Sequence, residues 1–189
     1  HIIHIDIDPA ELGKNKKVEL PIVADVGIAL NSLIASLKRK IVKRDKTLWS
    51  KRLQEIKSQI REGDFGSSNE LYQPKIVQKM RELLPSNGIL TTEVGKNQMW
   101  GELYYQAIEP RTWITSTGLG TMGFGFPAAI GAKVAKPEVP VVDLAGDGSF
   151  RMTENSLSTC IEEDIPVTVV ILNNSTLGMV EQWQRLFYN

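Results

Sequence analysis

The chain has 189 residues and no formal net charge, because 22 lysines and arginines balance 22 aspartates and glutamates. This balance argues against a protein that binds nucleic acids or membrane surfaces through its overall charge. The apolar fraction of 42% and the charged fraction of 23% are typical of a globular protein, and no apolar run is long enough to span a membrane. A single cysteine cannot form an intramolecular disulfide, which favours a reducing, cytoplasmic setting.

The first forty residues predict two short strands and a helix. Isoleucines alternate with polar residues over residues 1–8, and residues 21–24 form a second apolar run. Asp25 has a side chain that caps helices, and the helix after it should reach about Lys40. An acidic residue at a strand end, such as Asp6, often accepts ribose hydroxyls of a dinucleotide, although a solvated strand end explains it equally well. This unit is too small to hold a core alone.

The polar segment that follows predicts a linker between two domains. Residues 41–72 are rich in Lys, Arg, Glu and Gln, with a weak helical stripe and a loop of Gly, Ser and Asn over 63–69. The chain begins without methionine inside a strand pattern and ends just after a helical run. We therefore expect a piece of a longer polypeptide, divided into residues 1–40, 41–72 and 73–189.

The third segment begins with alternating helix and strand patterns. The expected elements are a helix over residues 73–84, strands over 88–92 and 112–115, and a helix over 128–134. Polar and glycine residues from Glu93 onward open another helix, and they are placed to give hydrogen-bond donors to an anion. The glycines of residues 118–127 allow a loop to lie flat against a planar ligand.

The clearest pattern is a strand, a helix and a second strand. Two β-branched apolar runs, within residues 139–150 and 167–174, stop abruptly at polar or glycine residues. This is typical of strands that are buried on both faces of a parallel sheet. Residues 153–163 between them predict a helix with Thr153 as its N-cap. The crossover of such a βαβ unit is expected to be right-handed.

Chemistry is expected beyond the carboxyl ends of these two strands, where open α/β sheets bind their ligands. Asp147 follows the first strand and Asn174 the second, and their carboxylate and amide oxygens suit Mg²⁺. Gly146 and Gly148 allow a close backbone approach, and Ser149 adds a donor for an anion. Each feature alone is usually only a turn. Together they predict a site for Mg²⁺ and a diphosphate.

The Gly-Asp-Gly of this site, with the Asn-Asn that follows the next strand, resembles the thiamin diphosphate motif. From Ile5 onward the chain also resembles the large, catalytic subunits of the acetohydroxyacid (acetolactate) synthases. The matching segments are residues 5–14, 118–127, 146–152 and 172–188. The Gly-Met-Val-x-Gln-Trp-Gln pattern that begins at Gly178 marks this member of the superfamily.

The resemblance implies a polypeptide of three α/β domains, which bind the pyrimidine, FAD and the diphosphate. Residues 1–40 resemble the last strand–helix units of the FAD-binding domain, and residues 73–189 resemble much of the diphosphate domain. The implied fold class is therefore α/β, with a parallel sheet that binds thiamin diphosphate.

Roles for single residues around this cofactor are implied by the resemblance. Asp147, Asn174 and the backbone oxygen of Thr176 would hold Mg²⁺. The Gly120 carbonyl would meet the aminopyrimidine, and Met122 would support the bent cofactor. The residues implied to contact the cofactor are Val94, Gly95, Lys96, Asn97, Gly120, Met122, Gly146, Asp147, Gly148, Ser149, Asn174, Thr176, Leu177, Gly178 and Met179.

Two further sites are implied in the same way. Met179 and Trp183 would shape the pocket for a second 2-oxo acid. FAD, which is structural in this family rather than redox-active, would touch Asp6, Ile7, Asp25 and Val26.

Two departures from the family pattern bear on the expected chemistry. Lys96 and Asn97 stand where the family usually has Gln-His, and Lys96 could still meet phosphate as a point charge. The family's catalytic glutamate belongs to the pyrimidine-binding domain, which this chain lacks. Glu93 is in the wrong place to replace it. We therefore expect no catalytic residue in this chain and no activity from the chain alone.

The implied reaction condenses two pyruvates, or pyruvate and 2-oxobutyrate, with loss of CO₂ in branched-chain amino acid biosynthesis. The implied partners are further copies of the chain, in a dimer or a larger homo-oligomer, and a small regulatory subunit.

Three alternatives stay open. The first is another thiamin diphosphate-dependent decarboxylase, oxidase or carboligase of 2-oxo acids, against which the segment at residues 182–184 argues. The second is a Mg²⁺-dependent phosphatase with Asp147 as its nucleophile, but Asp143, the acid four residues earlier, lies inside the strand. The third is a fragment that binds without catalysing.

Overall fold

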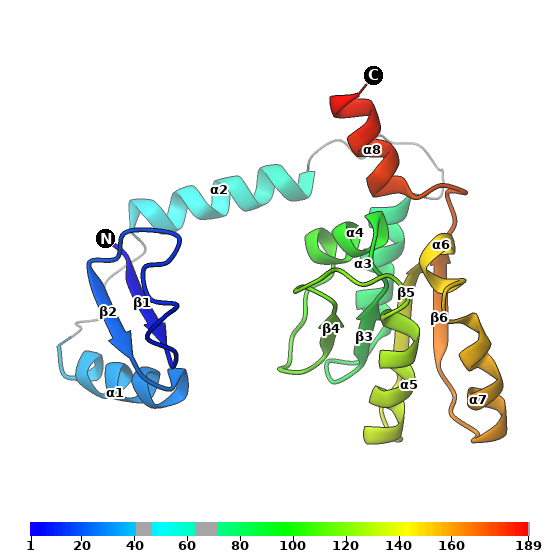
Figure 1. The fold of residues 1–189 in the computed structure, drawn as a ribbon, viewed down its shortest axis with the longest axis horizontal. Helices are drawn as coiled ribbons and strands as arrows, with labels where there is room; N and C mark the ends of the chain where they lie inside the picture. The colour runs from blue at the N-terminus through cyan, green and yellow to red at the C-terminus, as the bar shows by residue number, and fades with distance from the viewer. Residues whose placement is uncertain (41–46, 63–71, 189) are drawn as a thin grey trace. The chain divides into compact units, whose positions relative to one another are not determined.

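The computed structural model describes residues 1–40, 47–62 and 72–188, and the chain divides into two units, residues 1–63 and 64–189 (Figure 1). The loop predicted over 63–69 lies outside the described residues. Among the helices that are described, none has the length and apolar character that crossing a bilayer requires.

The first unit contains a pair of parallel strands followed by two helices. Its elements are β1 (Ile3–Asp6), β2 (Leu20–Val23), α1 (Val26–Lys38) and α2 (Leu48–Glu62). The predicted N-cap is confirmed, because Asp25 Oδ1 accepts a hydrogen bond from the backbone N–H of Ile28 at 3.0 Å. No residue of α1 is buried, and its valine, isoleucine and leucine side chains are exposed within the described structure.

The second unit contains a four-stranded sheet in the order β4-β3-β5-β6, and all three strand pairs are parallel. The strands are β3 (Ile89–Thr92), β4 (Trp113–Thr115), β5 (Val141–Gly146) and β6 (Thr168–Leu172). The predicted parallel α/β fold is confirmed. In Figure 1, α6 and α8 lie at the same end of this sheet, beyond the carboxyl ends of β5 and β6.

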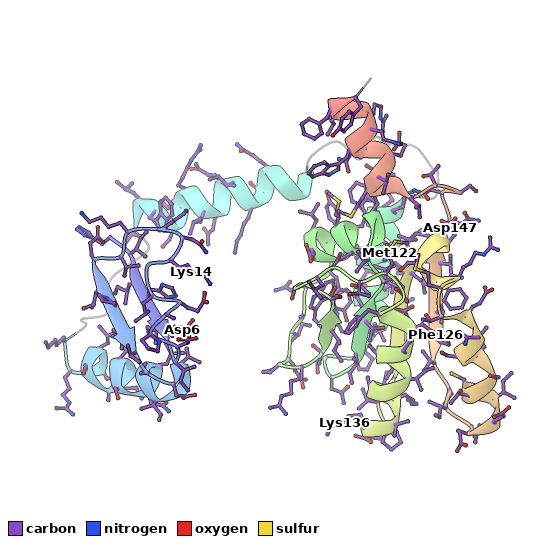
Figure 2. The ribbon with its side chains drawn as sticks, in the orientation of Figure 1. Asp6, Lys14, Met122, Phe126, Lys136 and Asp147 are labelled. Atoms are coloured by element: carbon purple, nitrogen blue, oxygen red, sulfur yellow. The ribbon has the colours of Figure 1, made fainter. Side chains whose placement is uncertain are left out.

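Helices follow the strands of the second unit at almost every step. They are α3 (Gln73–Leu83), α4 (Lys96–Tyr104), α5 (Gly125–Ala135), α6 (Asp147–Phe150), the 3₁₀ helix η1 (Glu154–Ser156), α7 (Leu157–Glu162) and α8 (Gly178–Phe187). Figure 2 shows Met122 and Asp147 at the end of this unit opposite to Lys136.

The sheet has a hydrophobic core on each face, because neighbouring residues of a strand point to opposite sides. Leu90 and Leu144, which are both fully buried, join a cluster with residues of α3 and α4. Ile89 and Val141 join a second cluster with Ala129 and another residue of α5. Burying each aliphatic side chain contributes about 1.5–3 kcal/mol. These two clusters hold β3 and β5 at the centre of the sheet.

The helix predicted over residues 153–163 is wrong in detail. The structure has η1 and α7 there, and Thr153 precedes them without capping through its side chain. The side chain of Thr153 instead packs against Gly123, where an added Cβ would lie 3.1 Å from Thr153 Cγ2, and the Thr153 hydroxyl is buried without a partner. Tertiary packing therefore outweighs the local capping preference of threonine.

The prediction that both strands of the βαβ unit are buried on two faces holds for β5 alone. Four of the six residues of β5 are buried, but β6 is half-buried and its Ile171 is 43% exposed. The reason is position, since β6 pairs only with β5 among the described strands. An apolar run alone does not distinguish a central strand from an edge strand.

Helix α5 begins at Gly125, three residues before the predicted start, and Gly125→Ala tests the close packing there. A Cβ at this position would lie 2.5 Å from Asp143 Oδ1 and 2.6 Å from the backbone N of Glu93, so the backbone has to shift. We expect urea denaturation to report a free energy of unfolding lower by about 1–3 kcal/mol, as in other overpacked cores.

The matched control is Gly131→Ala on the same helix, where an added Cβ meets no atom within 4 Å. It should raise the free energy of unfolding by about 0.5–1 kcal/mol, because alanine loses less backbone entropy in a helix than glycine. Equal effects of the two substitutions would contradict the packing argument.

Candidate functional site

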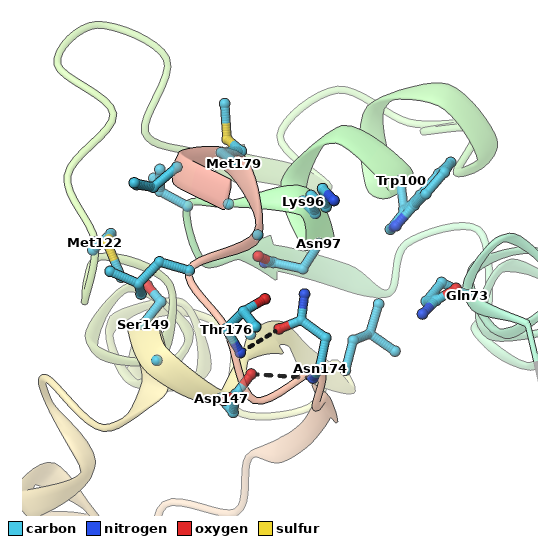
Figure 3. Close-up of a pocket in the computed structure, with 18 of the residues that line it drawn as sticks. Gln73, Lys96, Asn97, Trp100, Met122, Asp147, Ser149, Asn174, Thr176 and Met179 are labelled. Atoms are coloured by element: carbon cyan, nitrogen blue, oxygen red, sulfur yellow. Dashed lines mark hydrogen bonds between the residues drawn. The ribbon is translucent and has the colours of Figure 1, made fainter. Parts of the chain in front are cut away.

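A cavity of about 440 Å³ lies where β5 and β6 end, and its walls come from six elements and their loops (Figure 3). Every residue predicted to contact thiamin diphosphate is among its lining residues. The lining residues are Gln73, Val94, Gly95, Lys96, Asn97, Trp100, Gly120, Met122, Gly146, Asp147, Gly148, Ser149, Leu172, Asn174, Thr176, Leu177, Gly178, Met179 and Val180.

Hydrogen bonds hold the predicted metal ligands close to one another. Asp147 Oδ1 accepts from the backbone N–H of Asn174 at 3.3 Å, and Asn174 Oδ1 accepts from the N–H of Thr176 at 3.1 Å (Figure 3). Ser175 between them has a φ of 55°, and both its N–H and its hydroxyl donate to Asn173 Oδ1. The turn after β6 is therefore folded back onto the start of α6.

This corner of the cavity fits a magnesium ion that is shared with a bound anion. It offers one carboxylate, one amide oxygen and one backbone carbonyl, all hard oxygen ligands, and leaves further positions for phosphate oxygens. Among the described residues, no group of three or more His, Cys, Asp or Glu side chains is placed to hold a metal ion. The three oxygen ligands and the open positions suit an ion that also binds the oxygens of an anion.

Two helices point uncapped N-termini at the same cavity. The N-cap residues are Gly95 for α4 and Leu177 for α8, and neither gives a side-chain hydrogen bond to its helix. Both residues line the cavity. The first N–H groups of a helix lack partners within it and carry a partial positive charge, which stabilises an anion. The cavity thus provides two N-termini for negatively charged groups.

The two residues that depart from the family pattern have different surroundings. Asn97 is buried, and its Nδ2 donates to the carbonyl oxygens of Glu93 and Leu144, both at 2.8 Å. Its side-chain amide therefore holds α4 against the sheet. Lys96 is partly exposed, and its ammonium forms an ion pair with Glu181 of α8 at 3.4 Å. Lys96 supplies a positive charge close to the N-termini of both helices.

Two carboxyl groups, those of Glu93 and Asp143, are buried and lie outside the cavity lining, and the sequence analysis placed neither of them among the site residues. Glu93 is fully buried and accepts hydrogen bonds from Gly123, Phe126 and Ser149. Asp143 is also fully buried, and its Oδ1 accepts from the Thr91 hydroxyl at 2.9 Å, whereas its Oδ2 has no partner.

The remaining predicted residues are placed as follows. Met179 lines the cavity, but Trp183 is outside the lining; it is 61% exposed, with its ring 5.3 Å from that of Phe187. In the first unit, Asp6 ends β1 and accepts from the N–H of Asp8. The other residues predicted to touch FAD are Ile7, Asp25 and Val26, which lie just beyond the ends of β1 and β2.

Sequence reasoning missed four residues that line the cavity: Gln73, Trp100, Leu172 and Val180. Trp100 had a usable signal, because it lies four residues after Lys96 and so on the same face of a helix. Val180 adjoins the predicted Met179. Gln73 had no signal, since only the packing of α3 against the rest of the unit brings it there.

Comparisons with known proteins agree with this geometry. The family model described as "Thiamine pyrophosphate enzyme, C-terminal TPP binding domain" matches residues 93–189. The chain is 47% identical, over 99% of its length, to a "Probable acetolactate synthase large subunit" from Methanocaldococcus jannaschii, of which it covers 32%.

Two other relatives are similarly related to the chain. It is 46% identical to "Acetolactate synthase 1, chloroplastic" of Zea mays and 42% identical to "Acetolactate synthase" of Mycobacterium leprae, over 99% of its length and 30% of theirs. The chain therefore spans about a third of the length of these relatives.

Asp143 predicts a pH dependence of stability. Burial chiefly, with a smaller contribution from nearby Glu93, raises the pKa of Asp143 from 3.8 to about 7, against the opposing hydrogen bond from Thr91. Between these values the folded chain keeps a proton that the unfolded chain has lost. The free energy of unfolding should therefore fall as pH rises from about 4 to 7, by up to about 4 kcal/mol at about 1.4 kcal/mol per pKa unit.

Urea denaturation at several pH values measures this slope, and Asp143→Asn should remove most of it. The control is Glu102→Gln, which changes an exposed carboxylate on α4 and should leave the slope unchanged. A slope that persists in Asp143→Asn would show that another group is responsible.

Proposed function

The chain belongs to the thiamine pyrophosphate enzymes through their C-terminal TPP-binding domain, and from this premise we propose that its second unit binds thiamin diphosphate together with Mg²⁺. The observation that carries the proposal is the convergence of the Asp147–Asn174–Thr176 corner and two uncapped helix N-termini on one cavity. Oxygen ligands for the cation and N–H donors for the anion then act on the same bound group.

Each wall of the cavity has a separate role in this proposal. Asp147, Asn174 and the Thr176 carbonyl hold Mg²⁺, while the N-termini of α4 and α8 donate to the diphosphate. The carbonyl of Gly120 accepts from the aminopyrimidine, and Met122 supports the organic part of the cofactor. When bound, thiamin diphosphate supplies an electron sink for carbanion chemistry. The residues of this chain anchor and orient it.

We further propose that the whole polypeptide is an acetolactate synthase. It would condense two pyruvates, or pyruvate and 2-oxobutyrate, with loss of CO₂ in branched-chain amino acid biosynthesis. The names and identities of the relatives support this proposal. Met179 and Trp183 would meet the second 2-oxo acid, and residues 1–40 would be the end of a domain whose Asp6, Ile7, Asp25 and Val26 touch a structural FAD.

The assembly and location of the polypeptide belong to the same proposal. A homo-oligomer with a small regulatory subunit is expected by analogy with the family. A cytoplasmic location is proposed for this polypeptide, whereas the name of the maize relative places that protein in the chloroplast.

Catalysis needs an acid or base, and Asp147 and Lys96 are the titratable side chains among the described residues that line the cavity. Asp147 is the one carboxylate among the described residues that line it, and in our proposal it is a metal ligand. Glu93 lies outside the cavity lining, with its carboxylate already bonded to three donors. A phosphatase that uses Asp147 as its nucleophile lacks its second acid, because Asp143 is buried inside β5. Anchoring without turnover is therefore the proposed role of the chain alone.

Calorimetric titration of the chain with thiamin diphosphate, with and without Mg²⁺, tests the binding proposal. We expect binding that requires Mg²⁺ and that weakens at least about tenfold in Asp147→Ala, because a lost charged ligand costs more than about 1.4 kcal/mol. Glu162→Ala, an exposed substitution on α7, is the control. Circular dichroism should verify that each sample is folded. A folded chain that shows no Mg²⁺-dependent binding would refute the proposal.

The absence of a catalytic group predicts that the chain alone produces no acetolactate. The assay supplies pyruvate, thiamin diphosphate, Mg²⁺ and FAD, and a complete acetolactate synthase serves as the positive control. Acetolactate formed above the protein-free background would contradict the prediction.

A further inference from the structure

We infer that Glu93 is a positioning residue for the cofactor: its buried carboxylate holds the 120–123 loop and Ser149 where the cavity needs them. The inference rests on the proposed function, because it concerns the same site. It adds a residue that does not line the cavity and to which the sequence analysis assigned no role at the site.

The carboxylate of Glu93 joins three segments that are far apart in the sequence. Its Oε1 accepts from the N–H of Phe126 at 2.9 Å, and its Oε2 accepts from the N–H of Gly123 at 2.8 Å and the hydroxyl of Ser149 at 2.6 Å. The N–H of Gly123 also approaches Ser149 Oγ at 3.0 Å. A fully buried charge is tolerated only with such partners, and hydrogen bonds to ionised groups are about twice as strong as neutral ones.

The same carboxylate caps a helix that has no cap of its own. Phe124 is the N-cap residue of α5 and makes no side-chain hydrogen bond to the helix. Glu93, which follows the end of β3, supplies the missing acceptor through Phe126, and its negative charge lies at the positive end of the helix. The chain thus provides an anion for α5, whereas the N-termini of α4 and α8 are left for the ligand.

The loop before α5 is tightly constrained at the residue that Glu93 binds. Gly123 has a φ of 82°, and an added Cβ would lie 3.1 Å from both Met152 Cβ and Thr153 Cγ2. Gly120 and Met122 lie within three residues before Gly123, and both line the cavity; Gly120 has a φ of 64°. Ser149 also lines the cavity, and Figure 3 shows it together with Met122. The hydrogen bond from Gly123 to Glu93 therefore fixes the position of the loop, and with it the Gly120 carbonyl and the Met122 side chain.

Glu93→Gln tests this inference, because glutamine has the same size but turns one acceptor into a donor that faces donors. Two readouts are needed. Amide hydrogen exchange on the ligand-free chain reports the tether itself, and calorimetry with Mg²⁺ and thiamin diphosphate reports its effect on the cofactor. We expect amide exchange at Gly123 and Phe126 to become at least about tenfold faster, while exchange at Leu90 and Leu144 stays unchanged. The dissociation constant for thiamin diphosphate should rise at least about tenfold.

Asp143→Asn is the matched control, since it also changes a buried carboxyl group at the centre of the sheet but one without a hydrogen bond to the loop. The dissociation constant of the Asp143→Asn variant for thiamin diphosphate should stay within about twofold of the wild-type value. If Glu93 merely stabilised the fold, its substitution would speed amide exchange throughout the sheet. Its effect on the dissociation constant would then equal that of Asp143→Asn. If Glu93→Gln does not fold, Glu93→Asp keeps the charge but shortens its reach, and the same two readouts should change in the same direction.

The possible outcomes separate the inference from the proposed function. If the wild type binds the cofactor and the Glu93 variant binds equally well, the inference is overturned while the proposed function stands. If the folded wild type does not bind, the proposed function fails, and the claim that Glu93 serves the cofactor fails with it. In that case exchange at Gly123 and Phe126 still decides whether Glu93 holds the loop, and unchanged exchange would reject the tether as well.

Discussion

A single buried charge links the parts of the second unit that surround the cavity. Glu93 directly follows β3, and its buried carboxylate accepts hydrogen bonds from donors of the 120–123 loop, α5 and α6. Removing any of these donors leaves the charge less well compensated, so the loop and both helices are constrained together. The positions of the lining residues Gly120, Met122 and Ser149 therefore depend on this buried carboxylate.

Parallel pairing explains why a ligand site forms beyond the carboxyl ends of the strands. Since β3, β5 and β6 all run in one direction, Gly95, Asp147 and Asn174 emerge beyond the same edge. The helices that begin there present their N-termini to the cavity, and their unpaired N–H groups favour an anion. Cation ligands and anion donors therefore come together as a consequence of topology.

The kinds of side chain that line the cavity also limit the chemistry that the chain can perform. Its cavity offers oxygen ligands, N–H donors and one lysine, groups that suit the anchoring of a charged cofactor. The buried carboxyl groups of Glu93 and Asp143 lie outside the cavity lining and accept hydrogen bonds from neighbouring segments. Anchoring and acid–base chemistry are separable tasks, and in our proposal this chain, which spans about a third of the length of its relatives, performs the first of them.

The sequence by itself determined the features that depend on local pattern. Apolar runs located the strands, Asp25 marked a helix start, and the Gly-Asp-Gly and Asn-Asn segments identified residues that line one cavity. These succeed because strand alternation, capping and turn chemistry act within a few residues. Only the tertiary structure decided that β6 is a half-exposed edge strand among the described strands, that residues 153–163 break into η1 and α7, that Gln73 reaches the cavity, and that Glu93 is buried. In each case the deciding partner is distant in the sequence, and burial of a charge or of a strand face depends on that partner rather than on neighbouring residues.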